Sequence, residues 1–441
     1  MKLRRFSPGF FITFFIILIS LIFIAAASFS AQIKLSDIKH LNLPILFIET
    51  ENGKKIKSKT EYRKASYRLE AGNSLLEGKC KIRGRGNTTW RTRELYKKPF
   101  LLKLSTPESL LGMKKNEKWV LMANTADKTS LRNYYAEYLA KNIFSNQPWT
   151  PSSRFTILYI NGRFEGLYAI TEKVEMTEGR ITPPSDESFL AEVNSHMNKE
   201  WNFRSKHGVP FSIRKEIEDD LSDNDKINDK SNGENTNQIS TAEETYKKYQ
   251  NIIQNIENII FSDNFTDKNN GYRKYLDIDS FVDWYLINEF TKNTDAAFQS
   301  SCYLYYNEKK DKLFMGPIWD FDLSCGNTSW NNCQYPEGEF INTNSWYKRL
   351  FEDNFFKESV HNRFLLKTNE LDNSFKWIQD QADFLYPSVK INDAVWKNIG
   401  HRQWPHAPGW KGRKTYQAEV DYMIDFLKKR KTWLENEYKK N

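Results

Sequence analysis

The sequence predicts an α+β fold in which a β-rich first half is followed by a mainly helical second half. Between residues 43 and 171, short apolar segments alternate with turns that contain glycine and asparagine. After residue 246, apolar residues recur at the spacing of amphipathic helices. Hydrophobic residues make up 39% of the 441 residues and aromatic residues 15%, which is enough for a substantial core. A wholly disordered chain is therefore excluded.

The first half contains a series of predicted strands and one predicted helix. Strands are expected at residues 43–50, 65–70, 79–83, 100–104, 155–160 and 164–171. The last two form a hairpin, because Asn161-Gly162 between them is a strong signal for a two-residue turn. A helix is expected at 128–144, with Thr125 or Asp127 capping its start.

The second half adds helices around one further hairpin. Helices are expected at 246–261, 278–290 and 416–438, and the hairpin strands at 302–306 and 313–318. The segment from Glu216 to about Thr241 is polar and has few apolar residues. Such a composition does not offset the entropy of ordering, so residues 219–240 are expected to be a flexible insertion within the domain.

The N-terminus has the features of a targeting segment. Lys2, Arg4 and Arg5 precede an almost unbroken apolar run at 10–27, a pattern typical of an export signal. The run is also just long enough to cross a bilayer as a helix. A cleaved signal peptide and an uncleaved membrane anchor therefore both fit residues 1–31, with one domain at 32–441. Either way, the domain is expected outside the cytoplasmic membrane, secreted or tethered through residues 10–27.

Charge and cysteine content exclude several function classes. Lysine and arginine exceed aspartate and glutamate by 65 to 56, and this excess of +9 is scattered rather than gathered into a long stripe. Nucleic acid is therefore not an expected partner. The four cysteines are Cys80, Cys302, Cys325 and Cys333. They are too few for a disulfide framework, and without a C-x-x-C pair they predict neither a zinc nor a redox site.

Two aspartates in the second half carry the clearest chemical signal. Asp295 follows the predicted helix at 278–290, and Asp320 follows the predicted hairpin, which returns the chain so that both acids can face one cleft. Phosphoryl transfer needs one carboxylate to orient the attacking hydroxyl and another to hold the metal that bridges the nucleotide's phosphates. Asp322 would add a second contact, since carboxylates suit magnesium or manganese. A solvated cap or turn remains the ordinary alternative for an aspartate after a helix.

Five segments stand out along the chain as possible motifs. They are IRGRGNTTW at 82–90, KKPFLLKL at 97–104, WVLMAN with DK and LRN at 119–133, the hairpin from Asn161-Gly162 to Glu172-Lys173, and GPIWDFDL at 316–323. In this order they resemble the CotH (spore-coat protein H) kinase-like family, and the resemblance covers about residues 43–330.

The resemblance implies a two-lobed atypical protein-kinase-like fold, with an N-lobe at about 40–175 and a C-lobe at 176–441. It implies transfer of the γ-phosphate of ATP, with Mg²⁺ or Mn²⁺, to serine or threonine of secreted, surface or spore-coat proteins. Asp295 would be the catalytic aspartate and Asp320 the principal metal ligand. The candidate nucleotide-binding residues are Lys103, Glu172, Lys173, Arg85 and Asn87. For Lys103 a surface lysine is an equal alternative, and Glu172 and Lys173 could instead form a structural ion pair.

One position departs from the kinase pattern. A kinase has asparagine five positions after the catalytic aspartate to hold a second metal, whereas this chain has Ser300. A hydroxyl is a poorer magnesium ligand than a carboxamide oxygen, and Asp322 could compensate. The main alternative is therefore a catalytically inactive surface or coat protein with the same fold.

Two other functions are less well supported by the sequence. The tryptophans and tyrosines, among them Trp330, Tyr335, Trp346, Trp396, Trp404 and Trp410, could stack on carbohydrate, although aromatic residues in such numbers are more often core. Asp320 and Asp322 could form the metal–nucleotide-sugar motif of a glycosyltransferase, but the chain lacks the alternating strands and helices of a nucleotide-sugar domain.

Overall fold

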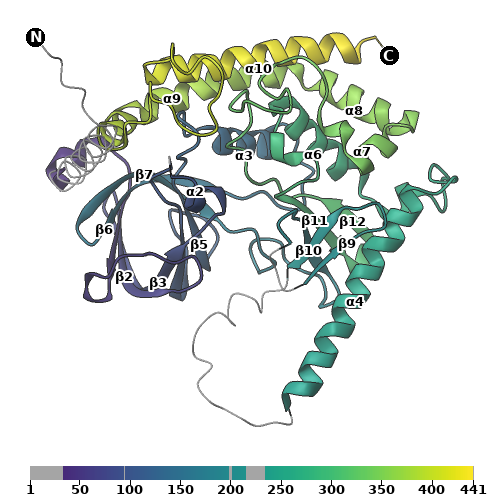
Figure 1. The fold of residues 1–441 in the computed structure, drawn as a ribbon, viewed down its shortest axis with the longest axis horizontal. Helices are drawn as coiled ribbons and strands as arrows, with labels where there is room; N and C mark the ends of the chain where they lie inside the picture. The colour runs from purple at the N-terminus through teal and green to yellow at the C-terminus, as the bar shows by residue number, and fades with distance from the viewer. Residues whose placement is uncertain (1–32, 94, 198–200, 215–233, 441) are drawn as a thin grey trace, which may run out of the picture.

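The computed structural model describes residues 33–93, 95–197, 201–214 and 234–440. The apolar run at 10–27 and most of the predicted insertion lie outside these residues. Along the chain, a β-barrel comes first and a smaller sheet second, and helices of the C-terminal half cover both (Figure 1). The predicted α+β class is confirmed, with a β-rich N-terminal and a helical C-terminal region.

Seven strands form a closed barrel in the order β1-β2-β3-β4-β5-β7-β6. Their bounds are β1 Ile45–Thr50, β2 Arg63–Ala71, β3 Ser74–Gly84, β4 Phe100–Glu108, β5 Asn116–Met122, β6 Ser153–Ile160 and β7 Arg163–Glu172. Neighbours pair antiparallel except β1 and β6, which are parallel and close the barrel. The predicted β6–β7 hairpin is confirmed, and Asn161 and Gly162 both have the positive φ that its turn requires.

Alternation along β4 separates the barrel core from the outer face. Phe100, Leu102 and Leu104 are buried inside the barrel, whereas Leu101 belongs to a different buried cluster outside it. That outer cluster also contains Val120 of β5. Because side chains of a strand point alternately to opposite faces, the same two strands build the barrel and one side of the junction with the second sheet.

The second sheet has five strands in the order β12-β11-β8-β10-β9. Their bounds are β8 Phe189–Val193, β9 Asn202–Arg204, β10 Pro210–Arg214, β11 Cys302–Asn307 and β12 Lys312–Met315. The predicted hairpin at 302–318 is β11–β12. Leu190, Tyr303 and Trp319 join the buried cluster that contains Leu101, so apolar side chains fill the junction between sheet and barrel.

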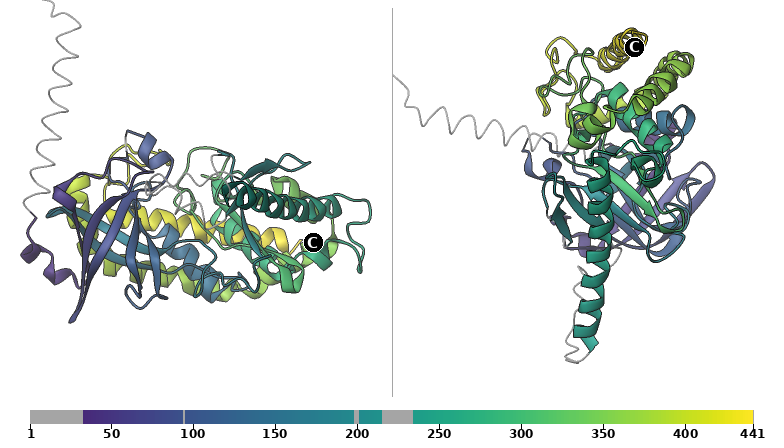
Figure 2. Two further views of the ribbon diagram at one scale, coloured as in Figure 1. Left: turned by 90° about the horizontal axis from the view of Figure 1, so that it is seen from below. Right: turned by 90° about the vertical axis from the view of Figure 1, so that its right-hand side faces the viewer.

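Nine α-helices lie within the described residues. They are α2 Thr88–Arg91, α3 Arg132–Asn142, α4 Glu234–Ile260, α5 Tyr272–Tyr275, α6 Ile278–Thr291, α7 Ser345–Leu350, α8 Asn354–Leu366, α9 Thr368–Trp396 and α10 Tyr416–Tyr438. α9 and α10 run together across the top of Figure 1, over both the barrel and the second sheet. α4 projects from the molecule in Figure 2. It begins at Glu234, so the last residues of the predicted insertion are helical.

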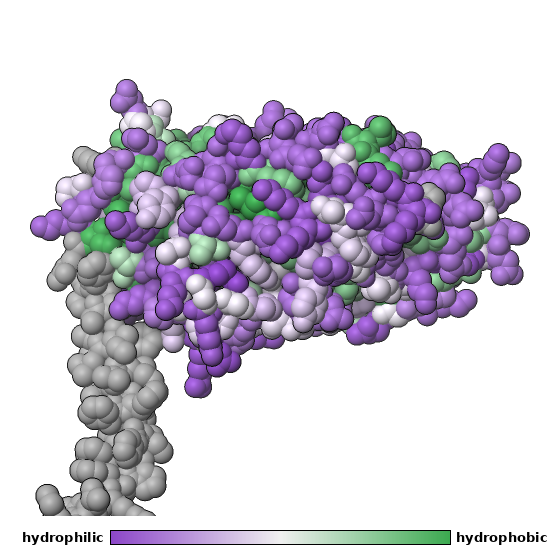
Figure 3. Space-filling view, turned by 90° about the horizontal axis from the view of Figure 1, so that it is seen from above, coloured by the Kyte–Doolittle hydropathy of each residue, from purple (hydrophilic) through white to green (hydrophobic). Residues whose placement is uncertain are grey.

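The helical surface seen from above is mainly hydrophilic, with isolated hydrophobic side chains (Figure 3). Exposed large apolar residues on this half of the chain include Leu366, Phe384 and Tyr386. Single exposed apolar residues of this kind are normal on a protein surface. Within the described part of the chain, no helix combines the length and the apolar character needed to cross a membrane.

Candidate active site

Asp295 is positioned by the end of a buried helix. α6 is capped at its start by Asp277, whose carboxylate accepts the backbone N–H of Ser280. The helix ends at Lys292, which adopts left-handed backbone angles and turns the chain. Asn293 then accepts the backbone N–H of Asp295 through its side chain, at 3.4 Å. The sequence therefore places Asp295 in a short 3-10 turn directly after the helix, as predicted.

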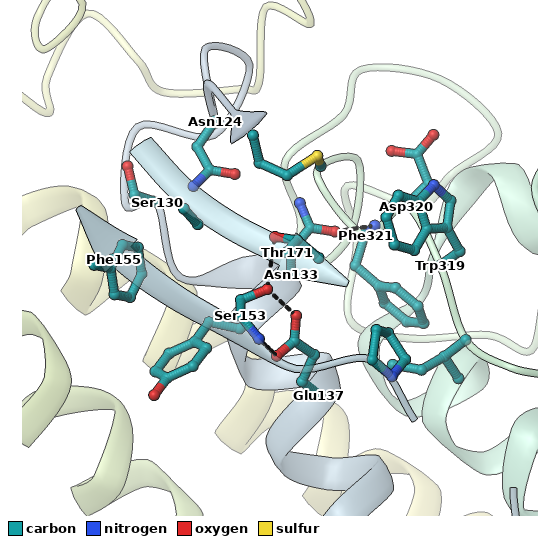
Figure 4. A pocket seen from close by; sticks show the side chains of 15 residues that line it. Asn124, Ser130, Asn133, Glu137, Ser153, Phe155, Thr171, Trp319, Asp320 and Phe321 are labelled. Carbon is teal, nitrogen blue, oxygen red and sulfur yellow. Dashed lines mark hydrogen bonds between the residues drawn. The ribbon is translucent and has the colours of Figure 1, made fainter. Parts of the chain in front are cut away.

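Asp320 follows β12 and has the left-handed φ of +67°. A non-glycine residue in this region is strained unless its surroundings hold it. The Asn293 amide donates to the Asp320 carbonyl at 3.2 Å, and the Asn133 side chain accepts the Phe321 N–H at 2.8 Å. Figure 4 shows Asn133 directed at Phe321, with Asp320 and Trp319 beyond it. The Ser301 hydroxyl donates to the Asp320 carboxylate at 3.3 Å.

The segment after Asp322 is tied to the barrel side of the molecule. The Asn327 amide donates to the Asp322 carbonyl at 2.6 Å and to the Ala126 carbonyl at 3.0 Å. Arg132 at the start of α3 donates to the Ser324 carbonyl at 2.9 Å and forms a buried ion pair with Asp127. Because α3 follows directly from the barrel, these contacts fix the segment from Asp320 to Asn327, called the acidic loop, relative to the barrel.

Asp295, Asp320 and Asp322, together called the acid wall, line one cleft of about 830 Å³ between the barrel and the second sheet. Burial and the neighbouring Asp320 raise the pKa of Asp295 to about 7. Burial also raises the pKa of Asp320, opposed by Arg85. Burial, Asp320 and Asp295 raise the pKa of Asp322 well above its usual range. Burial disfavours the charged form of all three carboxyls, and Asp320 raises the pKa of the other two, so a cation would be favoured at this site.

Lys59, Arg83, Arg85 and Asn87, together called the basic wall, line the same cleft from the barrel side. The Arg85 guanidinium lies 5.0 Å from the Trp319 ring centroid. Among the described residues it has no carboxylate within ion-pair distance, and burial lowers its pKa, opposed by Tyr303, Asp320 and Glu192. This guanidinium is therefore available to an anionic ligand in the cleft.

Gly84 and Gly86, which flank Arg85 in the sequence, are required by the local backbone and packing. A Cβ at Gly84 would lie 2.1 Å from the Trp90 ring, so only glycine allows this tryptophan to pack against β3. Gly86 has a φ of +97°, which favours glycine. Its carbonyl accepts the Lys59 ammonium at 2.9 Å. Arg83 and Arg85, which alternate with these glycines, both line the cleft.

A family model described as CotH kinase protein matches residues 82–434, which is most of the chain. The chain belongs to this family. The resemblance noted from its motifs is thereby confirmed, and membership points to a CotH-like kinase or spore-coat function. Comparison with curated proteins finds no match. The family motifs lie on β3 and α2, β4, β5 to α3, the β6–β7 hairpin and the acid wall.

In this CotH family protein, most of the candidate site residues come together. Those that line the cleft are Asp295, Asp320, Asp322, Ser300, Arg85, Asn87 and Lys173. Lys173 also pairs with Glu175 at 3.1 Å. Ser300 lines the cleft, but the hydroxyl that contacts Asp320 belongs to its neighbour Ser301.

Lys103 and Glu172 lie elsewhere among the described residues. Glu172 is 2% exposed, and its carboxylate accepts the Ser152 N–H at 2.9 Å, which is a structural contact. Lys103 stands on β4 between Lys81 and Lys118 of the neighbouring strands. It is outside the set of side chains that line the cleft.

The structure adds cleft residues that sequence reasoning did not select. Glu192 of β8 pairs with Arg214 of β10 at 2.9 Å, and both line the cleft. No motif marks them, because the pairing of β8 with β10 brings them together. Asn124 and Asn133 also line the cleft, and the buried Asn124 Oδ1 and Asn133 Nδ2 atoms have no hydrogen-bond partner among the residues that the structure describes. Their place in the 119–133 motif was the available signal.

A small cavity of about 20 Å³ lies beside the cleft and shares Asp320 with it (Figure 4). Glu137 of α3 faces this cavity, where its carboxylate accepts the Ser153 N–H at 2.9 Å. The Ser153 hydroxyl bonds with Glu137 and with Thr171. Burial raises the pKa of Glu137 to about 7. A polar, titratable layer thus supports the helix that carries Asn133.

The donor set fits a hard cation that is completed by a ligand's oxygens. In the described ranges, no three His, Cys, Asp or Glu side chains form a metal site on their own. Magnesium is commonly held by one or two carboxylates together with substrate phosphates and waters. Asp320 and Asp322 supply two carboxylates of this kind, whose raised pKa values reflect unfavourable charge burial.

Proposed function

We propose that this protein is an atypical protein kinase. It would transfer the γ-phosphate of ATP to a serine or threonine hydroxyl of a secreted, surface or spore-coat protein. The observation that carries the proposal is the convergence of the acid wall and Arg85 on one cleft. Phosphoryl transfer relies on positioning and electrostatic stabilisation of phosphate charge rather than on covalent chemistry by the protein, and this combination of groups supplies both.

In this proposal the barrel is the N-lobe, and the second sheet with its helices is the C-lobe. The chain passes from one to the other after Glu172, where Val174 and Met176 line the cleft together with Leu101 and Leu190. These apolar side chains suit the nucleotide base. The phosphates would then extend toward the basic wall and the acid wall.

Asp320 and Asp322 would hold Mg²⁺ or Mn²⁺, which supplies charge neutralisation at the phosphates. Asp295 would accept the proton of the acceptor hydroxyl. The hydroxyl oxygen would bond to the γ-phosphorus as the bond between that phosphorus and ADP breaks. A pKa of about 7 for Asp295 suits a general base at neutral pH. The Ser301 hydroxyl would keep the Asp320 carboxylate oriented.

Arg85, rather than Lys103, is our candidate for the cation that grips the phosphates. Arg85 lines the cleft together with Asp320, whose charge acts on it, whereas Lys103 lies outside the lining among the described residues. A guanidinium also binds phosphate oxygens in a bidentate manner, which an ammonium does not. Asn87 and Lys173 would add polar contacts from the same side.

The N-terminal sequence indicates where the proposed reaction would take place. A signal peptide or membrane anchor in residues 1–31 would deliver the domain outside the cytoplasmic membrane, where surface or coat proteins are the acceptors. A nucleic acid acceptor is not part of the proposal.

The test is transfer of labelled γ-phosphate by purified protein with Mg²⁺ or Mn²⁺. Asp295→Asn should lower transfer by about 10²-fold or more, the usual scale for a positioned general base. It should leave ATP affinity largely intact, because Asp295 is not a proposed metal ligand. Full transfer by the variant would contradict the role of Asp295.

A non-catalytic coat or adhesion protein is the second candidate, favoured by serine at position 300 in place of the kinase asparagine. ATP binding by wild type without transfer to any acceptor would support it. If the second metal is merely weakly held, Ser300→Asn should keep or raise transfer.

A further inference from the structure

The end of the cleft that lies beyond the acid wall is built from two tryptophans of distant segments. Trp330 follows the acidic loop, and Trp404 lies in the connection between α9 and α10. Their ring centroids are 6.0 Å apart with a tilt of 38°. Both side chains are half-buried, and both line the cleft that contains Asp295. The proposed transfer reaction gives this tryptophan pair no role.

Hydrogen bonds hold the tryptophan pair in place against the barrel side. The Gln403 amide donates to the Thr125 carbonyl at 2.7 Å, and the Ser329 hydroxyl donates to the Pro405 carbonyl at 3.1 Å. The Lys128 ammonium donates to the His401 carbonyl at 3.0 Å. The loop that carries Trp404 is therefore fixed by neighbours on both sides, although it has no regular secondary structure.

The proposed base site and the tryptophan pair contact β5 and its continuation at different points. At the start of β5, the Asn116 amide donates to the Thr177 hydroxyl at 3.1 Å, beside the chain that leaves the barrel. Just beyond the end of β5, Thr125 contacts Gln403. A seven-residue strand spans about 20 Å at roughly 3.3 Å per residue. Leu101 of the proposed base site pairs with Val120 within this strand, whereas the tryptophan pair is held just beyond its end.

The cleft is large for a site that holds one ligand. Its volume of about 830 Å³ is near the upper end of roughly 300–1,000 Å³ for sites that bury a single drug-sized ligand. If the base lies at the apolar end and the phosphates meet the acid wall, the tryptophan pair faces the side from which an acceptor must approach.

We infer that Trp330 and Trp404 form a subsite for an aromatic or large apolar side chain of the acceptor polypeptide, near the residue that is phosphorylated. The inference rests on the proposed kinase function. A tilted ring pair presents both a face and an edge, the arrangement that a third aromatic ring prefers. It offers less of the flat platform that a sugar ring would cover.

Local charge supports the same class of side chain. Residues 397–415 contain no aspartate or glutamate but include Arg402, Lys411 and Lys414. Glu419 lies near this loop, but it is paired with Arg413 at 2.8 Å and Lys128 at 3.5 Å. The loop that carries Trp404 therefore has no acidic side chain of its own to select a basic acceptor residue, whereas its aromatic side chain suits an aromatic or apolar one.

The experiment measures equilibrium capture of a positional-scanning library of serine-containing peptides by the full chain. Wild type should prefer aromatic or large apolar residues at one fixed offset from serine. Trp330→Ala and Trp404→Ala should each weaken capture of the preferred peptides by about tenfold, as expected for the loss of one buried aromatic contact. Trp410→Ala is the matched control, because this half-buried tryptophan is in the same loop but outside the cleft lining.

ATP affinity and thermal unfolding are measured on the same variants. Peptide capture does not require phosphoryl transfer, so its outcome is independent of the kinase proposal. That proposal is tested separately by ATP binding to the wild type. Unchanged peptide preference in both variants, or no peptide preference in wild type, would overturn the inference. Preference for oligosaccharides over peptides would overturn it as well. Loss of ATP affinity in the two tryptophan variants would assign the pair to the nucleotide instead.

Discussion

The two walls of the cleft are held in different ways. In the acid wall, the backbone is clamped by side-chain amides, since Asn293, Asn133 and Asn327 each bond to a backbone group of the acidic segments. In the basic wall, Lys59 and Arg83 donate to backbone carbonyls, and both arginine side chains also lie over aromatic rings. Arg83 lies 5.0 Å from the Tyr62 ring, and Arg85 lies 5.0 Å from the Trp319 ring.

This difference matters for the work that each wall would do. Metal coordination tolerates little error in the position of its ligands, so a clamped backbone suits Asp320 and Asp322. Phosphate oxygens move during transfer, and a guanidinium stacked on an aromatic ring can adjust within the ring plane while keeping its charge in the cleft. The contact of Arg85 with Trp319 also joins the two walls, because Trp319 directly precedes Asp320.

Among substitutions in the basic wall, that of Arg85 is expected to change ATP affinity most. Arg85→Ala should weaken ATP affinity about 10–100-fold, since a charge-assisted contact with phosphate is lost. Arg85→Lys should recover part of it. Lys103→Ala is the control and should change affinity by less than about twofold, because Lys103 is outside the cleft lining among the described residues. The reverse ranking, measured by calorimetric titration, would return the phosphate-binding role to Lys103.

A smaller effect is expected behind the acid wall, at Glu137. Its folded pKa of about 7 is higher than that of an exposed glutamate. The folded state therefore favours the protonated carboxyl of Glu137. The free energy of unfolding that this carboxyl contributes at low pH is lost as pH rises from about 4.5 to 7. Glu137→Gln cannot ionise, so its unfolding free energy should exceed that of wild type by about 1–2 kcal/mol above pH 8.

Denaturant unfolding at several pH values measures this difference. Exposed Glu77 provides the control, and Glu77→Gln should show no gain that grows with pH. If the Glu137→Gln advantage is the same at pH 5 and pH 8, then ionisation of Glu137 does not limit stability. That result would remove α3 as a pH-sensitive support of Asn133.

The sequence predicted those parts of the fold that local pattern determines. The Asn161-Gly162 hairpin, α6 and α10 appear where expected, because a turn dipeptide or a long apolar period specifies each one. The strands β8, β9 and β10 were missed, since β9 has three residues and long-range pairing defines the sheet. The helix α9 was missed although it has 29 residues, and Pro387 lies within it.

The same distinction applies to the site. Asp295 and Asp320 could be selected because each follows an element with a clear local signal, and the structure brings both to one cleft. Glu192 and Arg214 carry no such signal and meet through the pairing of β8 with β10. The Asn293 contact with Asp320 depends on the left-handed turn at Asp320, which nothing in the residue order reveals.

The most direct test of the account is a calorimetric titration of wild type and Asp320→Ala with ATP, in the presence and absence of Mg²⁺ or Mn²⁺. If both walls grip one nucleotide, wild type should bind one ATP with an affinity that rises when the metal is present. Asp320→Ala should lose at least about 10²-fold of that metal-dependent affinity while retaining a cooperative unfolding transition. Wild type that binds no ATP, or binds it equally with and without metal, would contradict the central claim.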